Sequence, residues 1–311
     1  MSASVFTVIS YVIVCLDLTF ESFLFHMILF KSPKSMNTFR VYLGCLCINS
    51  TSLSVITGFI WQPEIVSPPF CLYNNGLFQR FLDNRLMAAI TGALTVQYSQ
   101  ILLLSYLYVY SIIKSVTCKP LTSYRICQKV LFVLSPAFAF GFLIYNSKAS
   151  ASFVWNHVSF NLDNYESPAC YFVTDVKANR VMMYAVGYLL LYTSVFSFIA
   201  SYLLCRVSKK LKNPSTLTSA PTLKLYRMFF FNLLIQSLVP LVFLAVPFLT
   251  AFGYAAIKAD DVQSVLFKLA FTSFTLHSLI SCLLVIWVTK PYRQYLLKLL
   301  LKKRRVSVGS Y

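Results

Sequence analysis

Apolar runs alternate with short polar gaps along almost the whole chain. Seven such runs can be marked, and they have about the length that a helix needs to cross a bilayer. A hydrocarbon core of about 30 Å takes roughly 20 residues at 1.5 Å each. The pattern predicts an all-α membrane protein, a bundle of seven transmembrane helices. The predicted spans cover residues 5–30, 41–61, 86–113, 130–145, 181–204, 228–252 and 266–289.

The last apolar run leads directly into a basic tail with the sequence KPYRQYLLKLLLKKRR. Leu residues recur there at helical spacing, with Lys and Arg gathered around them. An amphipathic helix of this kind lies in the membrane surface and is attracted by anionic lipids. We therefore predict that residues 290–311 form a cytoplasmic tail whose amphipathic helix rests on the anionic inner leaflet of the bilayer. The whole chain, residues 1–311, is predicted to be a single domain.

Composition supports a membrane protein and excludes a soluble one. Hydrophobic residues make up 58% of the 311 residues, charged residues only 12%, and the mean hydropathy is +0.70. A soluble domain has about twice this charged fraction. The formal net charge of +18 does not indicate a nucleic-acid partner, because the basic residues lie in short gaps between apolar runs and not on one soluble face.

The distribution of charge predicts the orientation in the membrane. The gaps after the first, third and fifth runs, together with the tail, hold 20 of the 27 Lys and Arg and no acid. The other three gaps hold 7 basic residues and 7 acidic ones. Because Lys and Arg are enriched in cytoplasmic loops, we predict an extracellular amino terminus and a cytoplasmic carboxyl terminus.

No arrangement of residues indicates catalysis. The three histidines, His26, His157 and His277, lie in three different regions, and no metal-protease, phosphate-loop or serine-hydrolase motif is present. We therefore predict that the protein is not an enzyme and that it needs no cofactor or metal.

Two acids inside the first span form the most unusual feature of the apolar runs. Asp17 and Glu21 are four residues apart and so share one face of a helix. An acid at this depth is costly unless it faces the protein interior. It is either a ligand, ion or switch site, or only a polar contact between helices. His277 in the seventh span is a candidate partner, because the first and last helices of such a bundle are usually neighbours.

The sixth span carries two prolines, Pro240 and Pro247, with Asn232 and Gln236 close by. A proline removes one helix hydrogen bond and favours a kink. The span is therefore a candidate hinge, and a static kink is the alternative.

Two cysteines lie in the predicted outer segments, Cys71 before the third span and Cys170 before the fifth. An oxidising compartment favours a disulfide between them, and free thiols or other partners are the alternatives.

Several stretches resemble the nematode chemosensory seven-helix receptors, and within them serpentine receptor class H. CLDLTFESF followed by ILFKSPKSM is similar to the first helix and inner loop of that family, and ITGFIWQP to the end of its second helix. NLLIQSLVPLVFLAVP resembles the sixth helix. The Leu-His pair at His277, with TKPYR further on, resembles the seventh. The resemblance covers nearly the whole chain, and the K-P-Y-R ending is its most specific part.

The resemblance implies a G-protein-coupled receptor of sensory neurons, in the plasma membrane and in sensory cilia, that detects a small odorant or tastant. One departure concerns the third helix, which this family closes with an acidic-Asn-Arg triplet. Tyr108-Val109-Tyr110 stands there instead, so weakened coupling to a heterotrimeric G protein is one alternative. A transporter or ligand-gated channel, with Asp17 and Glu21 in its permeation path, is another. The residues expected to face the G protein are Tyr108, Tyr110, Lys209, Lys210, Lys212, Arg227, Pro291, Tyr292 and Arg293.

Overall fold

The structure is a computed structural model that describes residues 5–32, 37–66, 71–74, 76–78, 84–115, 198–209, 220–257 and 261–308. The predicted fourth span and most of the fifth lie outside these residues, as do Cys170, Lys210 and Lys212. For Cys71, the backbone is described and the side chain is not.

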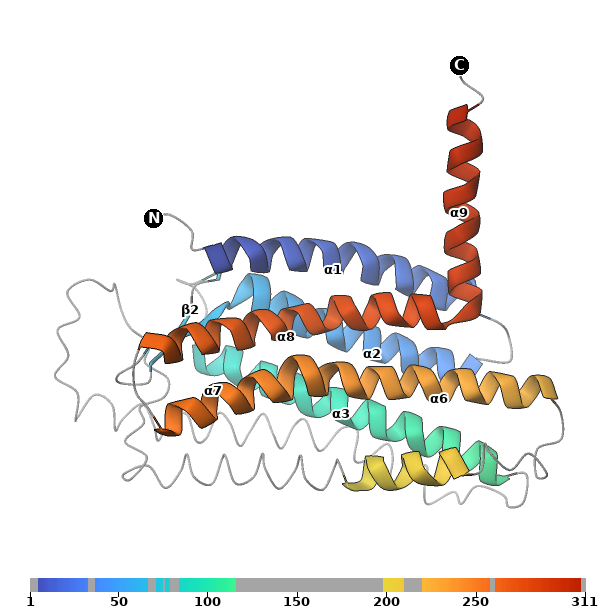
Figure 1. Cartoon of the computed structure of the whole chain (residues 1–311), viewed down its shortest axis with the longest axis horizontal. Coiled ribbons are helices and arrows are strands. Elements are labelled where there is room, and N and C mark those ends of the chain that lie inside the picture. Colours follow the sequence, from blue (N-terminus) through green and yellow to red (C-terminus); the bar gives the residue numbers. More distant parts are fainter. Residues whose placement is uncertain are drawn as a thin grey trace.

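Long helices lie side by side and form an elongated bundle (Figure 1). Two π-helical turns continue the second and sixth helices, and a short hairpin follows the first of them. The helices are α1 (Val5–Phe30), α2 (Asn37–Val55), α3 (Asn84–Ser115), α6 (Ala220–Pro240), α7 (Val246–Ile257), α8 (Asp261–Val288) and α9 (Lys290–Val308). The π turns are η2 (Ile56–Ile60) and η4 (Leu241–Ala245), the strands are β1 (Pro63–Val66) and β2 (Cys71–Asn74), and residues 198–209 are also helical.

Five helical segments in the described part of the chain are long and apolar enough to cross a membrane. Side chains such as Val8, Val12 and Leu16 of α1 are about half exposed on the outside of the bundle, as expected of a surface that faces lipid. The all-α membrane bundle predicted from the sequence is therefore confirmed. The five segments are Val5–Phe30, Phe39–Ile60, Leu86–Ser111, Lys224–Ala251 and Val265–Val288.

Helix α8 lies at the centre of the arrangement and contacts α1, α2, α6 and α7. The core between these helices and α3 is built from large side chains with almost no exposure, among them Met27, Phe39, Tyr106 and Leu233. Phe39 of α2 stacks on Phe229 of α6 with ring centroids 4.1 Å apart. Close packing of this kind holds the helices in fixed register.

A two-stranded hairpin closes one end of the bundle, which we call the hairpin end. β1 and β2 pair antiparallel, with Pro63 opposite Asn74 and Val66 opposite Cys71. The chain enters β1 through Gln62, whose φ of 42° is in the left-handed region. The Gln62 side chain stabilises this turn, since its Nε2 donates to the Gly58 carbonyl (2.8 Å) and the Thr7 carbonyl (3.4 Å).

At the opposite end, which we call the α9 end, the chain turns sharply after Val288. Pro291 has no N–H to donate to the carbonyl four residues earlier, so α8 cannot continue as a regular helix. The same proline is tolerated in the first turn of α9, where no intrahelical N–H bond is needed. Thr289 closes the corner, because its carbonyl accepts the N–H groups of Tyr292 (2.9 Å) and Arg293 (3.0 Å).

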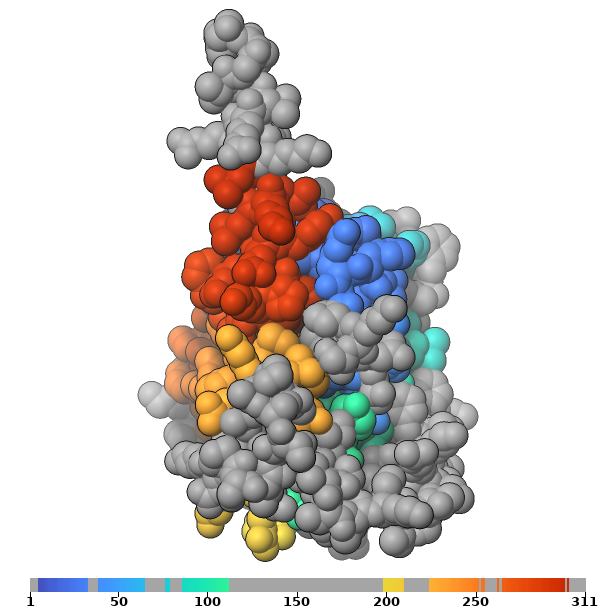
Figure 2. Space-filling model, turned by 90° about the vertical axis from the view of Figure 1, so that its right-hand side faces the viewer, coloured from blue at the N-terminus to red at the C-terminus, as the bar shows by residue number. Residues whose placement is uncertain are grey.

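Helix α9 therefore turns away from the bundle and runs across the direction of α8 (Figure 1). Seen from this end, its first turns lie beside residues of the amino-terminal helices (Figure 2), and the helix extends beyond the bundle (Figure 1). Leu297, Leu299 and Leu301 are exposed on it. A helix set across the direction of the spans has the geometry of one that lies along a membrane surface.

Gly58 in η2 marks a point of very close packing between three helices. A Cβ atom built there would lie 2.6 Å from Cγ2 of Val14 in α1 and 2.7 Å from Cγ2 of Thr275 in α8. Both neighbours are β-branched and so have little freedom to rotate away.

We expect Gly58→Ala to destabilise the protein by about 1–3 kcal/mol through overpacking. The matched control is Gly253→Ala in α7, where nothing lies within 4 Å of the added methyl group. Alanine favours a helix over glycine, so this control should be neutral or slightly stabilising. Thermal melting of both purified variants checks the pair, and an equal response of the two would contradict the packing argument.

Candidate functional site

A cluster of buried polar groups lies between α1, α2 and α8, and we call it the central polar cluster. Glu21 of α1 accepts hydrogen bonds on both carboxyl oxygens, from the Cys47 thiol on α2 and from the Ser278 hydroxyl on α8 (3.2 Å). Ser278 also bonds to Ser50 (2.6 Å). The cluster joins three helices through side chains, and its members are Asp17, Glu21, Cys47, Ser50, Ser54, Thr275 and Ser278.

Asp17 is the unusual member of this cluster. Its side chain is fully buried, and neither carboxyl oxygen has a hydrogen-bond partner among the described residues. The hydroxyls of Ser54 and Ser278 lie close enough to interact with this carboxyl group, but they bond elsewhere, Ser54 to the Thr275 carbonyl at 3.5 Å and Ser278 to Glu21. A buried polar group without a partner costs about 1–3 kcal/mol. Reorientation of either hydroxyl would supply that partner.

The imidazole of His277, the partner suggested for these acids, lies nearby but bonds elsewhere. Its Nδ1–H donates to the Phe274 carbonyl, and its ring stacks on Phe274 with centroids 5.3 Å apart. The α8 residue that reaches Glu21 is the next one, Ser278. His277 instead meets the ring of Tyr98 edge-on at 6.2 Å, and so connects α8 to α3.

Tyr98 of α3 contacts both His277 and the part of α6 that precedes Pro240. Its hydroxyl donates to the backbone carbonyl of Gln236 at 3.1 Å. This is the carbonyl that would accept the N–H of residue 240 in a regular α-helix, and residue 240 is a proline without an N–H. A phenol from a neighbouring helix therefore bonds the carbonyl that the proline leaves free.

The helix does not continue as a regular α-helix after Pro240. The next five residues form the π turn η4, and Pro247 follows in the first turn of α7. π turns within helices occur frequently at functional sites. The two predicted hinge prolines thus flank the one irregular segment of this helix.

A second tie between α3 and α6 lies two turns further toward the α9 end. The Tyr106 hydroxyl is bonded to the Leu233 carbonyl (2.9 Å) and to the Ser237 hydroxyl (2.8 Å). Asn232, on the neighbouring face of α6, donates from Nδ2 to Oγ1 of Thr289 at 2.9 Å. Both Asn232 and Thr289 are fully buried, so this bond fixes α6 to the corner between α8 and α9.

The corner residue Tyr292 is buried as well and reaches the start of the chain. Its hydroxyl shares a hydrogen bond of 2.7 Å with Ser32, directly after α1. Burial raises the pKa of Tyr292, so the phenol stays protonated and keeps this bond. Pro291 and Arg293 beside it are partly exposed, and the Arg293 guanidinium lies 5.9 Å from the Trp287 ring.

The other residues expected to face a G protein are also at the α9 end where they are described. Tyr108 is half-buried and packs against Tyr42 with ring centroids 5.5 Å apart, and Tyr110 is half-buried in the same core. Arg227 and Lys209 are exposed on α6 and on the helix of residues 198–209.

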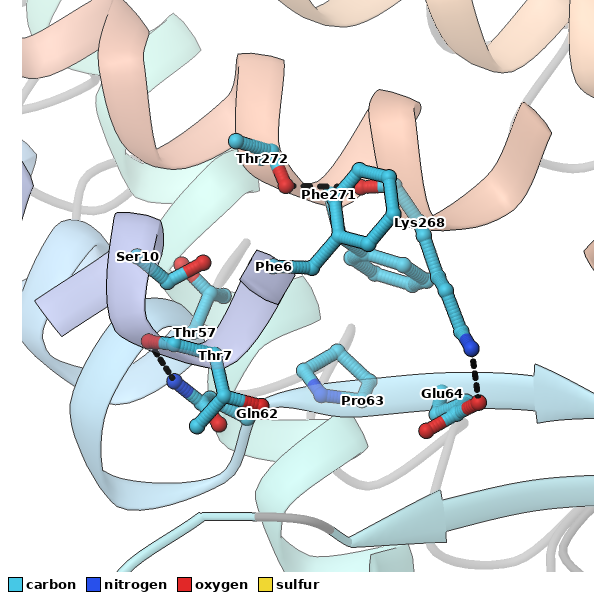
Figure 3. A pocket seen from close by; sticks show the side chains of 10 residues that line it. All are labelled: Phe6, Thr7, Ser10, Thr57, Gln62, Pro63, Glu64, Lys268, Phe271 and Thr272. Atoms are coloured by element: carbon cyan, nitrogen blue, oxygen red, sulfur yellow. Dashed lines mark hydrogen bonds and ion pairs between the residues drawn. The ribbon is translucent and has the colours of Figure 1, made fainter. Parts of the chain in front are cut away.

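A further hollow lies at the hairpin end, between α1, β1 and α8 (Figure 3). The Lys268 ammonium of α8 reaches across it to the Glu64 carboxylate of β1, at 2.5 Å. Phe6 and Phe271 contribute apolar surface, and the other lining residues are Thr7, Ser10, Thr57, Gln62, Pro63 and Thr272.

Sequence reasoning missed both Lys268 and Tyr98. The signal for Lys268 was present, since it is a cation three residues inside the last candidate span. Tyr98 is one of 20 tyrosines, and no motif or spacing in the sequence distinguishes it from the others.

These observations describe a helical, multi-span membrane protein with a polar interior and a broken sixth helix. The chain belongs to the family of serpentine type 7TM GPCR chemoreceptors of the Srh class, whose family model matches residues 1–302. This confirms the resemblance to serpentine receptor class H. A search among curated proteins found no match. The family is one of receptors and not of enzymes, and receptors of this kind in general bind small molecules and couple to G proteins.

Proposed function

We propose that this protein is a chemosensory G-protein-coupled receptor that detects a small environmental chemical, an odorant or tastant, and signals through a heterotrimeric G protein. The match to a chemoreceptor family over residues 1–302 carries the proposal. We further propose that it resides in the plasma membrane of sensory cilia. The amino terminus and the hairpin end are outside, and α9 rests on the anionic inner leaflet.

The geometry of α6 supports a mechanism for the signal. Its kink at Pro240 is held by Tyr98, and its inner half is held by Tyr106 and by the bond between Asn232 and Thr289. A rearrangement that follows ligand binding and displaces Tyr98 would free α6 at Pro240 and let its inner half move away from α3 and α8. The basic residues at the α9 end would then meet the G protein.

The central polar cluster is proposed as the switch that this movement passes through. Asp17 has no hydrogen-bond partner among the described residues, so a conformational state that brings a donor to its carboxyl group would be stabilised by that bond. The predicted disulfide between Cys71 and Cys170 stays a prediction. It would fasten the segment before the fifth span to β2 of the hairpin.

Ligand-evoked nucleotide exchange on a Gα subunit, measured with the full chain in membranes and a panel of odorants, tests the receptor function. The receptor predicts faster exchange with at least one compound. Ligand-evoked current without G protein would favour a channel, and silence in both assays with normal surface delivery would favour a receptor that has lost coupling. In the same assay Asp17→Asn should change basal exchange. An unchanged rate at normal surface level would exclude the switch role.

A further inference from the structure

Lys268 occupies a position where a cation needs an anionic partner. It lies within the candidate span Val265–Val288, near the hairpin end. An intramembrane Lys is expensive unless it is paired or reaches water, and it commonly marks a functional site. Its side chain is 26% exposed and the Glu64 side chain 23%, so the pair is partly shielded from solvent.

The pair closes the hollow shown in Figure 3. The cavity inside is about 40 Å³, which holds water but no organic molecule, and the hollow opens to the outside. The Glu64 carboxylate already lies against the Lys268 ammonium. An organic ligand therefore meets Lys268 from the open mouth, where it takes the place of the Glu64 side chain.

The polar groups around the hollow favour a negatively charged ligand. The Thr57 hydroxyl already donates to the Leu53 carbonyl, the Thr272 hydroxyl to the Lys268 carbonyl, and Gln62 Nε2 to two backbone carbonyls. The Lys268 ammonium has three N–H donors and forms an ion pair with Glu64. Lys268 is therefore the strongest donor that a ligand can meet.

The apolar walls restrict the rest of the ligand. The Phe6 ring of α1 and the Phe271 ring of α8 both line the hollow, together with Pro63 at the start of β1 (Figure 3). An aromatic or short apolar body can pack against these rings, because ring pairs gain stability from edge-on or offset contact.

We propose that this hollow binds a small carboxylic acid with an aromatic or short apolar body, whose carboxylate replaces that of Glu64 on Lys268. The role of this ligand as a signal rests on the proposed function. Its binding to the hollow does not. Exchange of one carboxylate for another keeps the charge of Lys268 compensated. It also breaks the ion pair between β1 and α8, so that ligand binding weakens the attachment of the hairpin to the last span.

Glu64 is then a built-in competitor for the ligand. Replacing it with the neutral isostere glutamine leaves Lys268 without a counter-ion and should destabilise the empty protein. The same replacement removes the competition and should tighten carboxylate binding by about fivefold, the factor that corresponds to the upper range of a partly exposed ion pair. A purely structural ion pair predicts the first effect without the second.

The experiment uses the full chain in nanodiscs of neutral phosphatidylcholine, with sodium benzoate as the probe and benzamide as its uncharged counterpart. Binding is followed by the rise in melting temperature with ligand concentration. Benzoate should stabilise the wild-type protein saturably and Glu64→Gln more strongly. Lys268→Gln and the doubly neutral Glu64→Gln/Lys268→Gln variant should lose at least tenfold in affinity, and benzamide should have no effect on any of them.

Lys224→Gln is the matched control, because it removes an exposed lysine at the other end of the bundle. It should bind benzoate like the wild type. The doubly neutral variant guards against misfolding of the single Lys268 variant, since it buries no unpaired charge. Equal responses to benzoate in the wild type and the doubly neutral variant would overturn the proposal, and so would a Glu64→Gln variant that gains nothing.

The binding assay contains no G protein, so the carboxylate site and the proposed G-protein coupling can be refuted independently. Benzoate binding without any nucleotide exchange would contradict the proposed coupling and leave this site in place. Exchange evoked by other compounds, with no benzoate binding in any variant, would contradict this site alone.

Discussion

Replacing Tyr98 with phenylalanine is expected to destabilise the protein by about 1–3 kcal/mol. The change removes one oxygen atom and little packing. The lost hydroxyl is the donor to the Gln236 carbonyl, and Pro240 has no N–H to take its place. Thermal melting of the purified variant measures the loss, and the same variant should show raised basal nucleotide exchange because the kink of α6 is no longer held.

A double-mutant cycle tests whether the loss of stability comes from the bond to the Gln236 carbonyl or from other contacts of the Tyr98 hydroxyl. In a Pro240→Ala background the new backbone N–H can bond the Gln236 carbonyl, so Tyr98→Phe should then cost much less. Tyr106→Phe is the matched control on the same helix. Its acceptor, the Leu233 carbonyl, also receives the Ser237 hydroxyl at 3.0 Å, so that loss should be the smaller one. Equal costs of Tyr98→Phe in the two backgrounds would refute the role assigned to Tyr98.

Breaking the hydrogen bond between Asn232 and Thr289 is expected to raise basal signalling and to reduce the stability of the fold only slightly. Asn232→Leu and Thr289→Val keep the approximate volume of each side chain and remove the one hydrogen bond between them. Interhelical hydrogen bonds in membrane proteins contribute about 0.6 kcal/mol on average and up to about 1.7. If the bond exists only in the resting state, basal nucleotide exchange should rise by roughly 3- to 20-fold, since 1.4 kcal/mol corresponds to tenfold.

The measurement is nucleotide exchange on a Gα subunit at equal receptor level, for each single variant and for the pair. Basal nucleotide exchange in the double variant should be close to that in each single variant, because both substitutions remove the same hydrogen bond. Thr250→Val is a suitable control, since its hydroxyl bonds only its own helix, at the Val246 carbonyl. Basal exchange that is unaltered in both single variants would mean that this bond persists in the active state.

The helices in the described part could be predicted from the sequence because lipid imposes a simple rule on it. Each span must be apolar for about 20 residues, so α1 occupies the same residues, 5–30, as the first apolar run. The interruption in α6 was also visible, because Pro240 is itself the cause of the missing hydrogen bond.

The contacts of the candidate site could not be predicted in the same way, because each joins residues far apart in the chain. The sequence pointed to His277 as a partner of the acids in α1, but helix rotation places Ser278 opposite Glu21. Tyr98 and Gln236 are 138 positions apart, and only the packing of α3 on α6 brings them together. The packing role of Gly58 could not be predicted from the sequence either, since it depends on contacts with Val14 and Thr275 in two other helices.

The two π turns have a consequence for how this family can vary in length. A π turn contains one residue more than an α turn, so the helix after η4 is one residue out of phase with the helix before it. Loss of a single residue from Leu241–Ala245 would restore an ordinary α turn and leave the faces of α6 and α7 where they are. η2 offers the same tolerance before the hairpin. Relatives that differ by one residue at either place can therefore share a single packing arrangement.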